Sequence, residues 1–161
     1  MTQLALPPTF AADDEPWRVA EWQRLWVATQ GRPWRSMALV PAGEDGPPDA
    51  TLEIAMALAR TGMRQVGSQI HVADATQLDL EGAREFVSQV RASVNTGPVI
   101  LALSSVAKNP VMVPLAQSAD CALLCIVLGH TKSADAQRTV DEIGRQHFIG
   151  VFAAQASGKA R

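Results

Sequence analysis

Uninterrupted apolar runs, separated by segments of helical periodicity, are the feature that most constrains how this chain folds. Residues 99–103 and 121–128 are apolar at every position, which is typical of strands covered on both faces of a sheet. Residues 36–41 and 148–152 are further strand candidates, and apolar residues recur at helical spacing between these runs. Strands that alternate with helices predict an α/β fold, in which a doubly wound, mostly parallel sheet carries helices on both faces.

The chain has 161 residues, the length of one domain. We expect a single α/β domain over residues 16–153 that opens with a tryptophan-rich helix at 16–30. Residues 1–15 show no periodicity and predict a flexible tail, and the small and polar residues 154–161 predict a frayed C-terminus.

Composition excludes some classes of function. The net charge is −2, and no cluster of lysine and arginine marks a nucleic-acid surface. The longest apolar run, residues 119–128, is too short to cross a membrane, and the N-terminus shows no signal peptide, so we expect a cytoplasmic chain without direct membrane insertion. Cys121 and Cys125 lie on one strand candidate and are separated by about 13 Å of extended chain. They cannot bond to each other, so reduced, buried thiols are expected.

Residues 36–62 have the layout of a phosphate-binding unit: a buried strand, a turn rich in glycine and proline, and an apolar helix that we expect to end at Gly62. A working phosphate loop ends in Gly-Lys-Ser/Thr, so that its lysine neutralises phosphate and its hydroxyl holds magnesium. The corresponding residues here are Gly43, Glu44, Asp45, Gly46, Pro47, Pro48, Asp49, Ala50 and Thr51.

This turn lacks the chemistry of a phosphate loop. Pro47 and Pro48 have no N–H to donate, no lysine follows Gly46, and Asp49 adds negative charge where phosphate would lie. The sequence therefore predicts a degenerate phosphate loop. The simpler alternative is that the two prolines only start a helix, with Asp49 at its electropositive end.

All four tryptophans lie in one short segment: Trp17, Trp22, Trp26 and Trp34. Tryptophan is enriched at interfaces, so a helix that binds a partner is one hypothesis. The alternative, which the sequence leaves equally open, is that this helix packs on its own domain.

Other reactive side chains form no recognisable catalytic or metal-binding pattern. His71, His130 and His147 are too scattered for a readable metal site. Ser104 and Ser105 follow a buried strand but lack the glycines of a nucleophile elbow, which disfavours an acyl-transfer enzyme. A last helix is expected at residues 133–147, capped by Thr131 or Ser133.

The order of these segments resembles the cytoplasmic P-loop domain of bacterial tyrosine kinases, which regulate exopolysaccharide and capsule export and are similar to chromosome-partitioning and division-site ATPases. The resemblance covers residues 17–152. It is carried by the Glu-Trp-Gln-Arg-Leu helix at 21–25, the unit at 36–62, the strand candidate at 99–102, the Ala119-Asp120 pair before residues 121–124, Thr131, and residues 148–151. It implies a P-loop NTPase-like fold.

The departures from this family bear on activity. The lysine and hydroxyl of the first motif are missing, and Ala102 or Leu103 stands where the family ends a strand in a magnesium-binding aspartate. Asp74 is the candidate for a remnant of the third, acidic motif, and the chain has no tyrosine to accept phosphate. Without these groups, phosphoryl transfer lacks its electrostatic stabilisation.

We therefore expect a catalytically inactive accessory or scaffold protein of bacterial exopolysaccharide biosynthesis or export, without a cofactor. The resemblance implies a homodimer or a polysaccharide-export membrane protein as partner, which would hold the chain at the inner membrane. One alternative is a divergent nucleotide-binding switch that binds ATP and Mg²⁺ weakly through Asp74 and the amides of residues 43–46. Another is an interaction module unrelated to polysaccharides.

Overall fold

The computed structural model describes residues 2–5, 15–43, 49–129 and 131–155. The strands are β1 (Thr2–Ala5), β2 (Ser36–Pro41), β3 (His71–Asp74), β4 (Val99–Ala102), β5 (Cys121–Leu128) and β6 (Phe148–Gln155). The α-helices are α1 (Ala20–Thr29), α2 (Ala50–Val66), α3 (Leu80–Ser93), α4 (Met112–Ser118) and α5 (Ser133–Ile143). Two short 3-10 helices, η2 (Pro16–Arg18) and η3 (Arg145–His147), precede α1 and β6.

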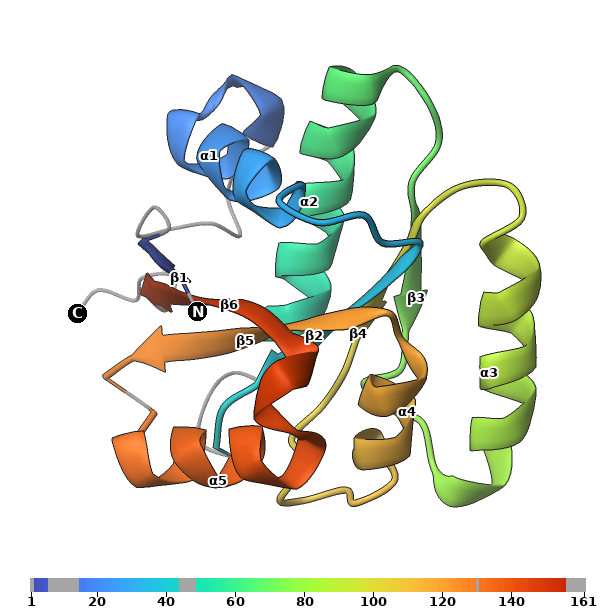
Figure 1. Ribbon diagram of the computed structural model, residues 1–161, viewed down its shortest axis with the longest axis vertical. Helices are drawn as coiled ribbons and strands as arrows, with labels where there is room; N and C mark the ends of the chain where they lie inside the picture. The colour runs from blue at the N-terminus through green and yellow to red at the C-terminus, as the bar shows by residue number, and fades with distance from the viewer. Residues whose placement is uncertain (1, 6–14, 44–48, 130, 156–161) are drawn as a thin grey trace.

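The described strands form one parallel sheet in the order β1-β6-β5-β2-β4-β3. Helices α1 and α2 cover one face, and α4 and α5 cover the other, with α3 near the β3 edge (Figure 1). The predicted doubly wound α/β fold is confirmed. No helix among the described residues is long and apolar enough to cross a membrane.

Alternating side chains of the central strands supply the two halves of the core. In β2, Met37 and Leu39 pack toward α1 and α2, whereas Ala38 and Val40 pack toward α4 and α5. Strand β5 alternates in the same way. From Cys121 to Ile126, each residue therefore belongs to one half of the core or the other, which explains why this part of the run carries no polar positions.

Helix α2 does not end at Gly62, where the sequence predicted its end. It continues to Val66 and ends at Gly67, which has the left-handed conformation. Gly62 lies inside the helix because Trp26 packs against it: a β-carbon at this position would be 2.5 Å from the Trp26 ring and 2.6 Å from Ile70. The glycine permits a close helix contact rather than a turn.

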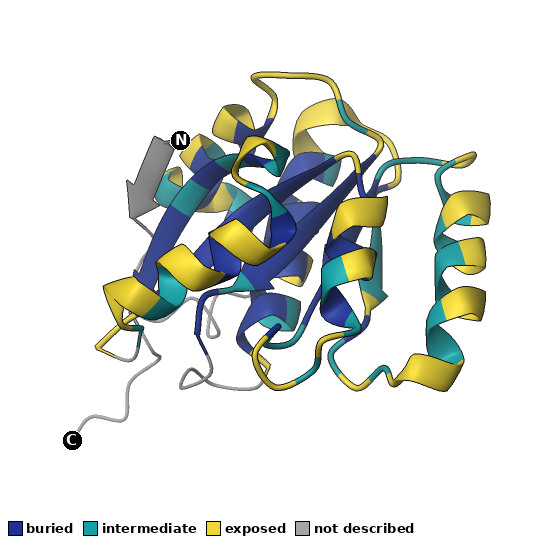
Figure 2. Ribbon diagram, turned by 60° about the horizontal axis from the view of Figure 1, so that its bottom comes forward, coloured by how far each residue is buried: buried dark blue, intermediate teal, exposed yellow. Residues whose placement is uncertain are grey.

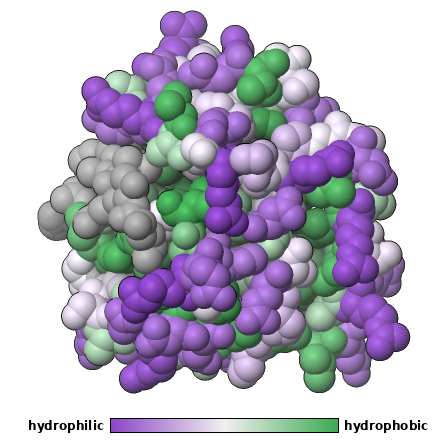
Figure 3. Space-filling model, in the orientation of Figure 1, coloured by the Kyte–Doolittle hydropathy of each residue, from purple (hydrophilic) through white to green (hydrophobic). Residues whose placement is uncertain are grey.

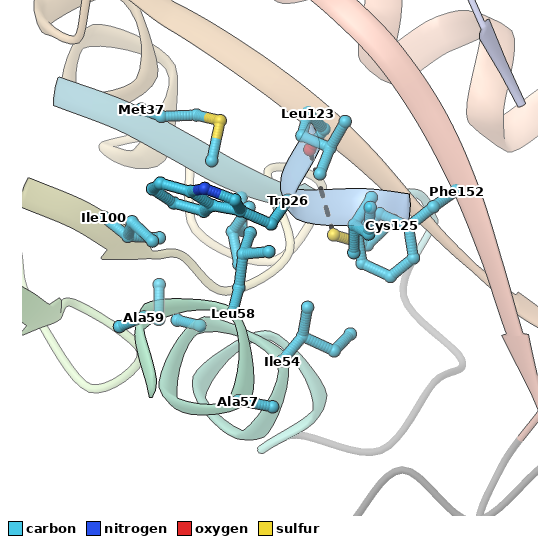
Figure 4. Packing of buried hydrophobic residues seen from close by; sticks show 14 of the residues in the cluster. Trp26, Met37, Ile54, Ala57, Leu58, Ala59, Ile100, Leu123, Cys125 and Phe152 are labelled. Atoms are coloured by element: carbon cyan, nitrogen blue, oxygen red, sulfur yellow. Dashed lines mark hydrogen bonds between the residues drawn. The ribbon is translucent and has the colours of Figure 1, made fainter. Parts of the chain in front are cut away.

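The tryptophan-rich segment packs on its own domain. Trp22 is fully buried and Trp26 is 4% exposed, and both belong to the core between α1, α2 and the sheet. Figure 4 shows Trp26 over α2, among Met37, Ile100 and Leu58. The partner-binding hypothesis therefore does not hold for Trp22 and Trp26 in this fold, because their rings already fill the core.

The other two tryptophans are half-buried at the border of this core. The Trp34 ring meets Trp26 edge to face at 6.2 Å, and its indole N–H donates to the Thr29 carbonyl. The Arg64 guanidinium lies 4.2 Å above the centre of the Trp17 ring, a cation–π contact. Trp34 therefore packs against the end of α1, whereas Trp17 joins η2 to α2.

Helix α3 is covered much less than the other long helices. None of its residues is buried (Figure 2). Leu80 at its start is 78% exposed. Its apolar stripe of Phe86, Val87 and Val90 is only half-buried against the core. Hydrophobic atoms are visible along the inner side of this helix, at the right of Figure 3. A position at the end of the sheet explains this, since no further layer covers the helix.

Asp120 connects the amino ends of β2 and β5. Its carboxylate accepts hydrogen bonds from the backbone N–H groups of Arg35 (2.7 Å) and Ser36 (3.2 Å). Its own N–H donates to the Ser36 hydroxyl and carbonyl, both at 3.0 Å, and its carbonyl accepts from Arg32. The Ala119-Asp120 pair therefore has a structural use here, because it fixes where two neighbouring strands start.

Three boundaries differ from the sequence prediction. Residues 2–5 of the predicted tail form β1, because backbone pairing with β6 at a sheet edge requires no hydrophobic periodicity. Residues 154 and 155 of the predicted frayed end belong to β6. Helix α5 starts at Ser133, as predicted, but ends at Ile143 and not at residue 147; Thr131 does not cap it but accepts from the Val127 N–H.

Candidate functional site

A cavity of about 170 Å³ opens at the carboxyl end of the central strands. Strand β2 lies between β4 and β5, and the connections from β2 and β4 leave on opposite faces of the sheet. Open α/β sheets bind ligands at such a switch point, outside the carboxyl ends of the strands. The fold thus places the cavity where a ligand site is expected.

The cavity has an apolar and a polar part. Its apolar lining includes Ala42, Leu103, Cys125 and Val127, from the ends of the three central strands. Its polar lining comes from α2 and from the loops after β3 and β4, and consists of Thr51, Thr76, Gln77, Ser104, Ser105 and Lys108. Residues from five separate segments therefore meet here.

The structure describes only part of the predicted degenerate phosphate loop. Gly43 has a φ of +76°, which favours glycine, and a β-carbon there would be 3.3 Å from the β-carbon of Asp135. Glu44, Asp45, Gly46, Pro47 and Pro48 lie outside the described residues. Asp49 is the N-cap of α2, and its side chain accepts no capping hydrogen bond. Ala50 and Thr51 begin the helix and line the cavity.

Thr51 uses its hydroxyl to hold the fold together. The side chain is 2% exposed, and Oγ1 donates a 2.6 Å hydrogen bond to the carbonyl of Leu103, just beyond β4. This bond ties the start of α2 to the end of the neighbouring strand.

The start of α2 carries negative charge. Asp49 is exposed, and one turn later the pKa of Glu53 is raised, first because partial burial disfavours its charge and second because Asp49 repels it. An approaching phosphate would meet both carboxyl groups. The electrostatics of this helix start therefore oppose the binding of a multiply charged anion.

Asp74 lies at the end of β3 and is exposed. Its Oδ1 accepts hydrogen bonds from the Thr76 N–H (2.9 Å) and hydroxyl (2.6 Å), which closes a tight turn beside the cavity. At the end of β4, Ala102 and Leu103 are fully buried. The end of β4, which pairs with β2, therefore carries no carboxylate at Ala102 or Leu103.

The sequence analysis missed Lys108 as a member of the site and considered Ser105 only as a nucleophile. Both follow the apolar run of β4, and the rule that ligands bind at the carboxyl ends of parallel strands could have singled them out. The Ser105 hydroxyl oxygen is buried and has no hydrogen-bond partner within the described part of the chain. Lys108 is exposed and forms no ion pair with any described residue.

The histidines and cysteines take other roles. His71 bonds to the Thr96 hydroxyl and His147 to the Ala116 carbonyl, while His130 lies outside the described residues. Residues 2–5, 15–43, 49–129 and 131–155 contain no cluster that could hold a metal ion. Cys121 and Cys125 are free and buried, as expected. Burial raises the pKa of Cys121 to about 11 and that of Cys125 well above its usual value, so neither thiol is reactive.

Comparison with known proteins relates this chain to others by shape. No protein-family model matches the sequence, and no curated protein matches it. Among solved structures, the chimerical protein CapA2B2 superimposes with a TM-score of 0.67 at 10% identity, over 95% of this chain and 92% of the other. A likeness at this identity shows a shared fold over nearly the whole chain.

Proposed function

We propose that this protein is a catalytically inactive, P-loop-ATPase-like scaffold in bacterial exopolysaccharide biosynthesis or export. The α/β fold supports the proposal, since the segments that resemble bacterial tyrosine kinases occupy a single parallel sheet. The name of the structural neighbour CapA2B2, of the kind given to capsule-biosynthesis proteins, points weakly toward a polysaccharide-related role.

One observation carries the inactive assignment: the end of β4 offers only the buried apolar side chains of Ala102 and Leu103. In a P-loop ATPase, a lysine, a hydroxyl and an acidic residue at these places would stabilise the transferred phosphoryl group with magnesium. Here Asp49 and Ala50 precede Thr51, so no lysine stands in this part of the loop. The cavity of 170 Å³ is also smaller than the roughly 300–1,000 Å³ typical of ligand pockets.

Calorimetry with ATP and MgCl₂ tests this part of the proposal. We expect no binding heat up to millimolar nucleotide, both for the natural protein and for Thr51→Val. A bacterial tyrosine kinase domain with an intact phosphate loop, titrated in the same buffer, is the positive control. Micromolar binding of ATP by the natural protein would refute the inactive assignment.

A scaffold requires a surface for its partner, and Trp22 and Trp26 do not provide one. Val27, on the outer side of α1, is 63% exposed and lies in a shallow groove with Arg24 and Gln65. We propose that this groove contacts the cytoplasmic tail of a polysaccharide-export membrane protein, which would bring the chain to the inner membrane. If no membrane protein binds this groove, we propose that the scaffold acts as a homodimer.

Co-purification with that membrane protein tests the surface. We expect Val27→Glu to reduce capture at least tenfold, because it places a charge in an apolar contact. Leu128→Glu is the matched control, since Leu128 is 48% exposed but lies at the end of β5. Equal capture of both variants would argue against the groove, and capture of no export component by the natural protein would favour an unrelated interaction module. Analytical ultracentrifugation of the same samples measures the homodimer.

A second candidate is a divergent nucleotide-binding switch, and Lys108 is the observation that favours it. This lysine lines the cavity and could supply the positive charge missing from the loop before α2. The calorimetric experiment separates the two candidates. If ATP binds and Lys108→Met abolishes the binding, the switch replaces the inactive scaffold.

A further inference from the structure

Helix α3 is the long helix that the described fold covers least. None of its residues is buried. Of the large apolar side chains in the described part of the chain, Leu80 at the start of α3 is the most exposed, at 78%. Scattered exposed apolar residues are common on monomers, so the meaning of Leu80 depends on what else this helix presents.

A groove of about 180 Å³ lies at the other end of α3. The helix and its C-cap line one wall of the groove with Val87, Val90, Arg91 and Val94. The opposite wall comes from the end of α4 and from the residues that start β2 and β5. The three valines are only half-buried. The groove therefore offers apolar surface beside an exposed arginine.

Leu80 and the groove lie on the same side of α3. Leu80, Arg84, Val87 and Arg91 follow one another at intervals of four, three and four residues, which places them in one row along the helix. From Leu80 to Arg91 the row covers three turns, or about 16 Å. A two-fold axis that crosses α3 midway along this row therefore brings Leu80 of each copy over Arg91 and the groove of the other.

The charges of α3 suit the same antiparallel arrangement. Glu81 lies in the first turn and Arg91 in the last, and neither forms an ion pair with any described residue. When two copies of the helix run antiparallel, the first turn of one meets the last turn of the other, so that Glu81 faces Arg91 twice. Arg84 lies near the axis, where Glu81 and Glu85 of its own helix offset its charge. A parallel pair would instead bring like charges together.

We propose that a second copy of this chain binds at α3, antiparallel and related by a two-fold axis. Leu80 of each copy fills the valine-lined groove of the other, and Glu81 pairs with Arg91 across the interface. The inference gives the homodimer an interface, but it rests on α3 alone and depends neither on the polysaccharide pathway nor on the groove beside Val27. The two proposals can therefore fail separately.

Sedimentation velocity of the full chain over a concentration series tests the dimer. We expect a concentration-dependent shift from monomer to dimer, and Leu80→Lys should raise the dimer Kd at least tenfold, because it puts a cation beside Arg91. Leu128→Lys is the matched control and should leave Kd unchanged, since Leu128 is 48% exposed but lies at the end of β5. A monomer at every concentration, or equal losses in the two variants, would overturn the proposal. Capture of a membrane protein through Val27 would be unaffected by Leu80→Lys.

Charge reversal tests the register of the two helices. Glu81→Arg and Arg91→Glu should each raise Kd at least fivefold, because like charges then meet across the interface. The double variant restores opposite charges and should return Kd to within about twofold of the natural value. Both reversals oppose the helix dipole, so a merely structural effect would make the double variant the weakest of the three. Absence of recovery in the double variant, or single variants with unchanged Kd, would show that α3 does not pair in this way.

Discussion

The two ends of the parallel sheet use their polar residues differently. At the amino end, the Asp120 carboxylate accepts hydrogen bonds from the backbone N–H groups of Arg35 and Ser36, and its carbonyl accepts one from the Arg32 side chain. At the carboxyl end, the Ser105 hydroxyl is unpaired and Lys108 makes no ion pair within the described residues. The amino end is thus a closed network, whereas the carboxyl end retains hydrogen-bonding capacity.

This difference clarifies the resemblance to bacterial tyrosine kinases. The Ala119-Asp120 pair, one of the features on which the resemblance rests, aligns two strands here. Thr51 likewise has a structural use, since its hydroxyl donates to the Leu103 carbonyl. A motif can match because it stabilises the fold, so its presence does not indicate that catalysis has been retained.

The substitution with the largest expected effect on stability lies in the hydrophobic core, away from both ends of the sheet. Trp22→Ala should lower the free energy of unfolding by about 3–5 kcal/mol, because it leaves a cavity where a large, fully buried ring packs. Urea denaturation followed by circular dichroism measures this. A loss below about 1 kcal/mol would mean that α1 is not part of the folded core.

The next effect tests whether the carboxyl end contains a structural bond. Thr51→Val should destabilise the protein by about 1–3 kcal/mol, because it leaves the buried Leu103 carbonyl without this donor. Thr51→Ser keeps the hydroxyl and is the control in the same denaturation experiment. If valine and serine variants are equally stable, the bond contributes nothing and the hydroxyl is free for another role.

A smaller effect is expected at the amino end. Asp120→Ala should cost about 1–2 kcal/mol, because two backbone N–H groups lose a charged acceptor, of which that of the exposed Arg35 can bond to water instead. Asp120→Asn keeps one acceptor oxygen, so its stability should lie between that of the natural protein and that of the alanine variant. An unchanged midpoint of thermal unfolding for the alanine variant would show that the network does not stabilise the strands.

The substitution with the smallest expected effect is the one that should not lower the stability of the protein. Ser105→Ala should leave the stability of the ligand-free protein unchanged or raise it by about 1 kcal/mol, because it removes a buried hydroxyl without a partner. Differential scanning calorimetry measures the shift. A clear destabilisation would mean that the hydroxyl is already satisfied, and the contrast between the two ends of the sheet would then disappear.

Much of the fold could be predicted from the sequence. Apolar runs at β4 and β5 are readable because a strand covered on both faces admits no polar residue. Gly62 and β1 were misread for related reasons. The glycine accommodates Trp26, which lies far away in sequence, and β1 pairs through its backbone, which leaves no pattern in the side chains.

The sequence alone determined that the phosphate-binding chemistry is incomplete, because a missing lysine or carboxylate is visible residue by residue. Only the tertiary structure decided what the remaining groups do. It buried Trp22 and Trp26, joined Thr51 to Leu103 across a long stretch of chain, and brought Ser105 and Lys108 to one cavity. Burial and hydrogen-bond pairing depend on segments that meet only after the sheet has formed, and local sequence carries no record of those contacts.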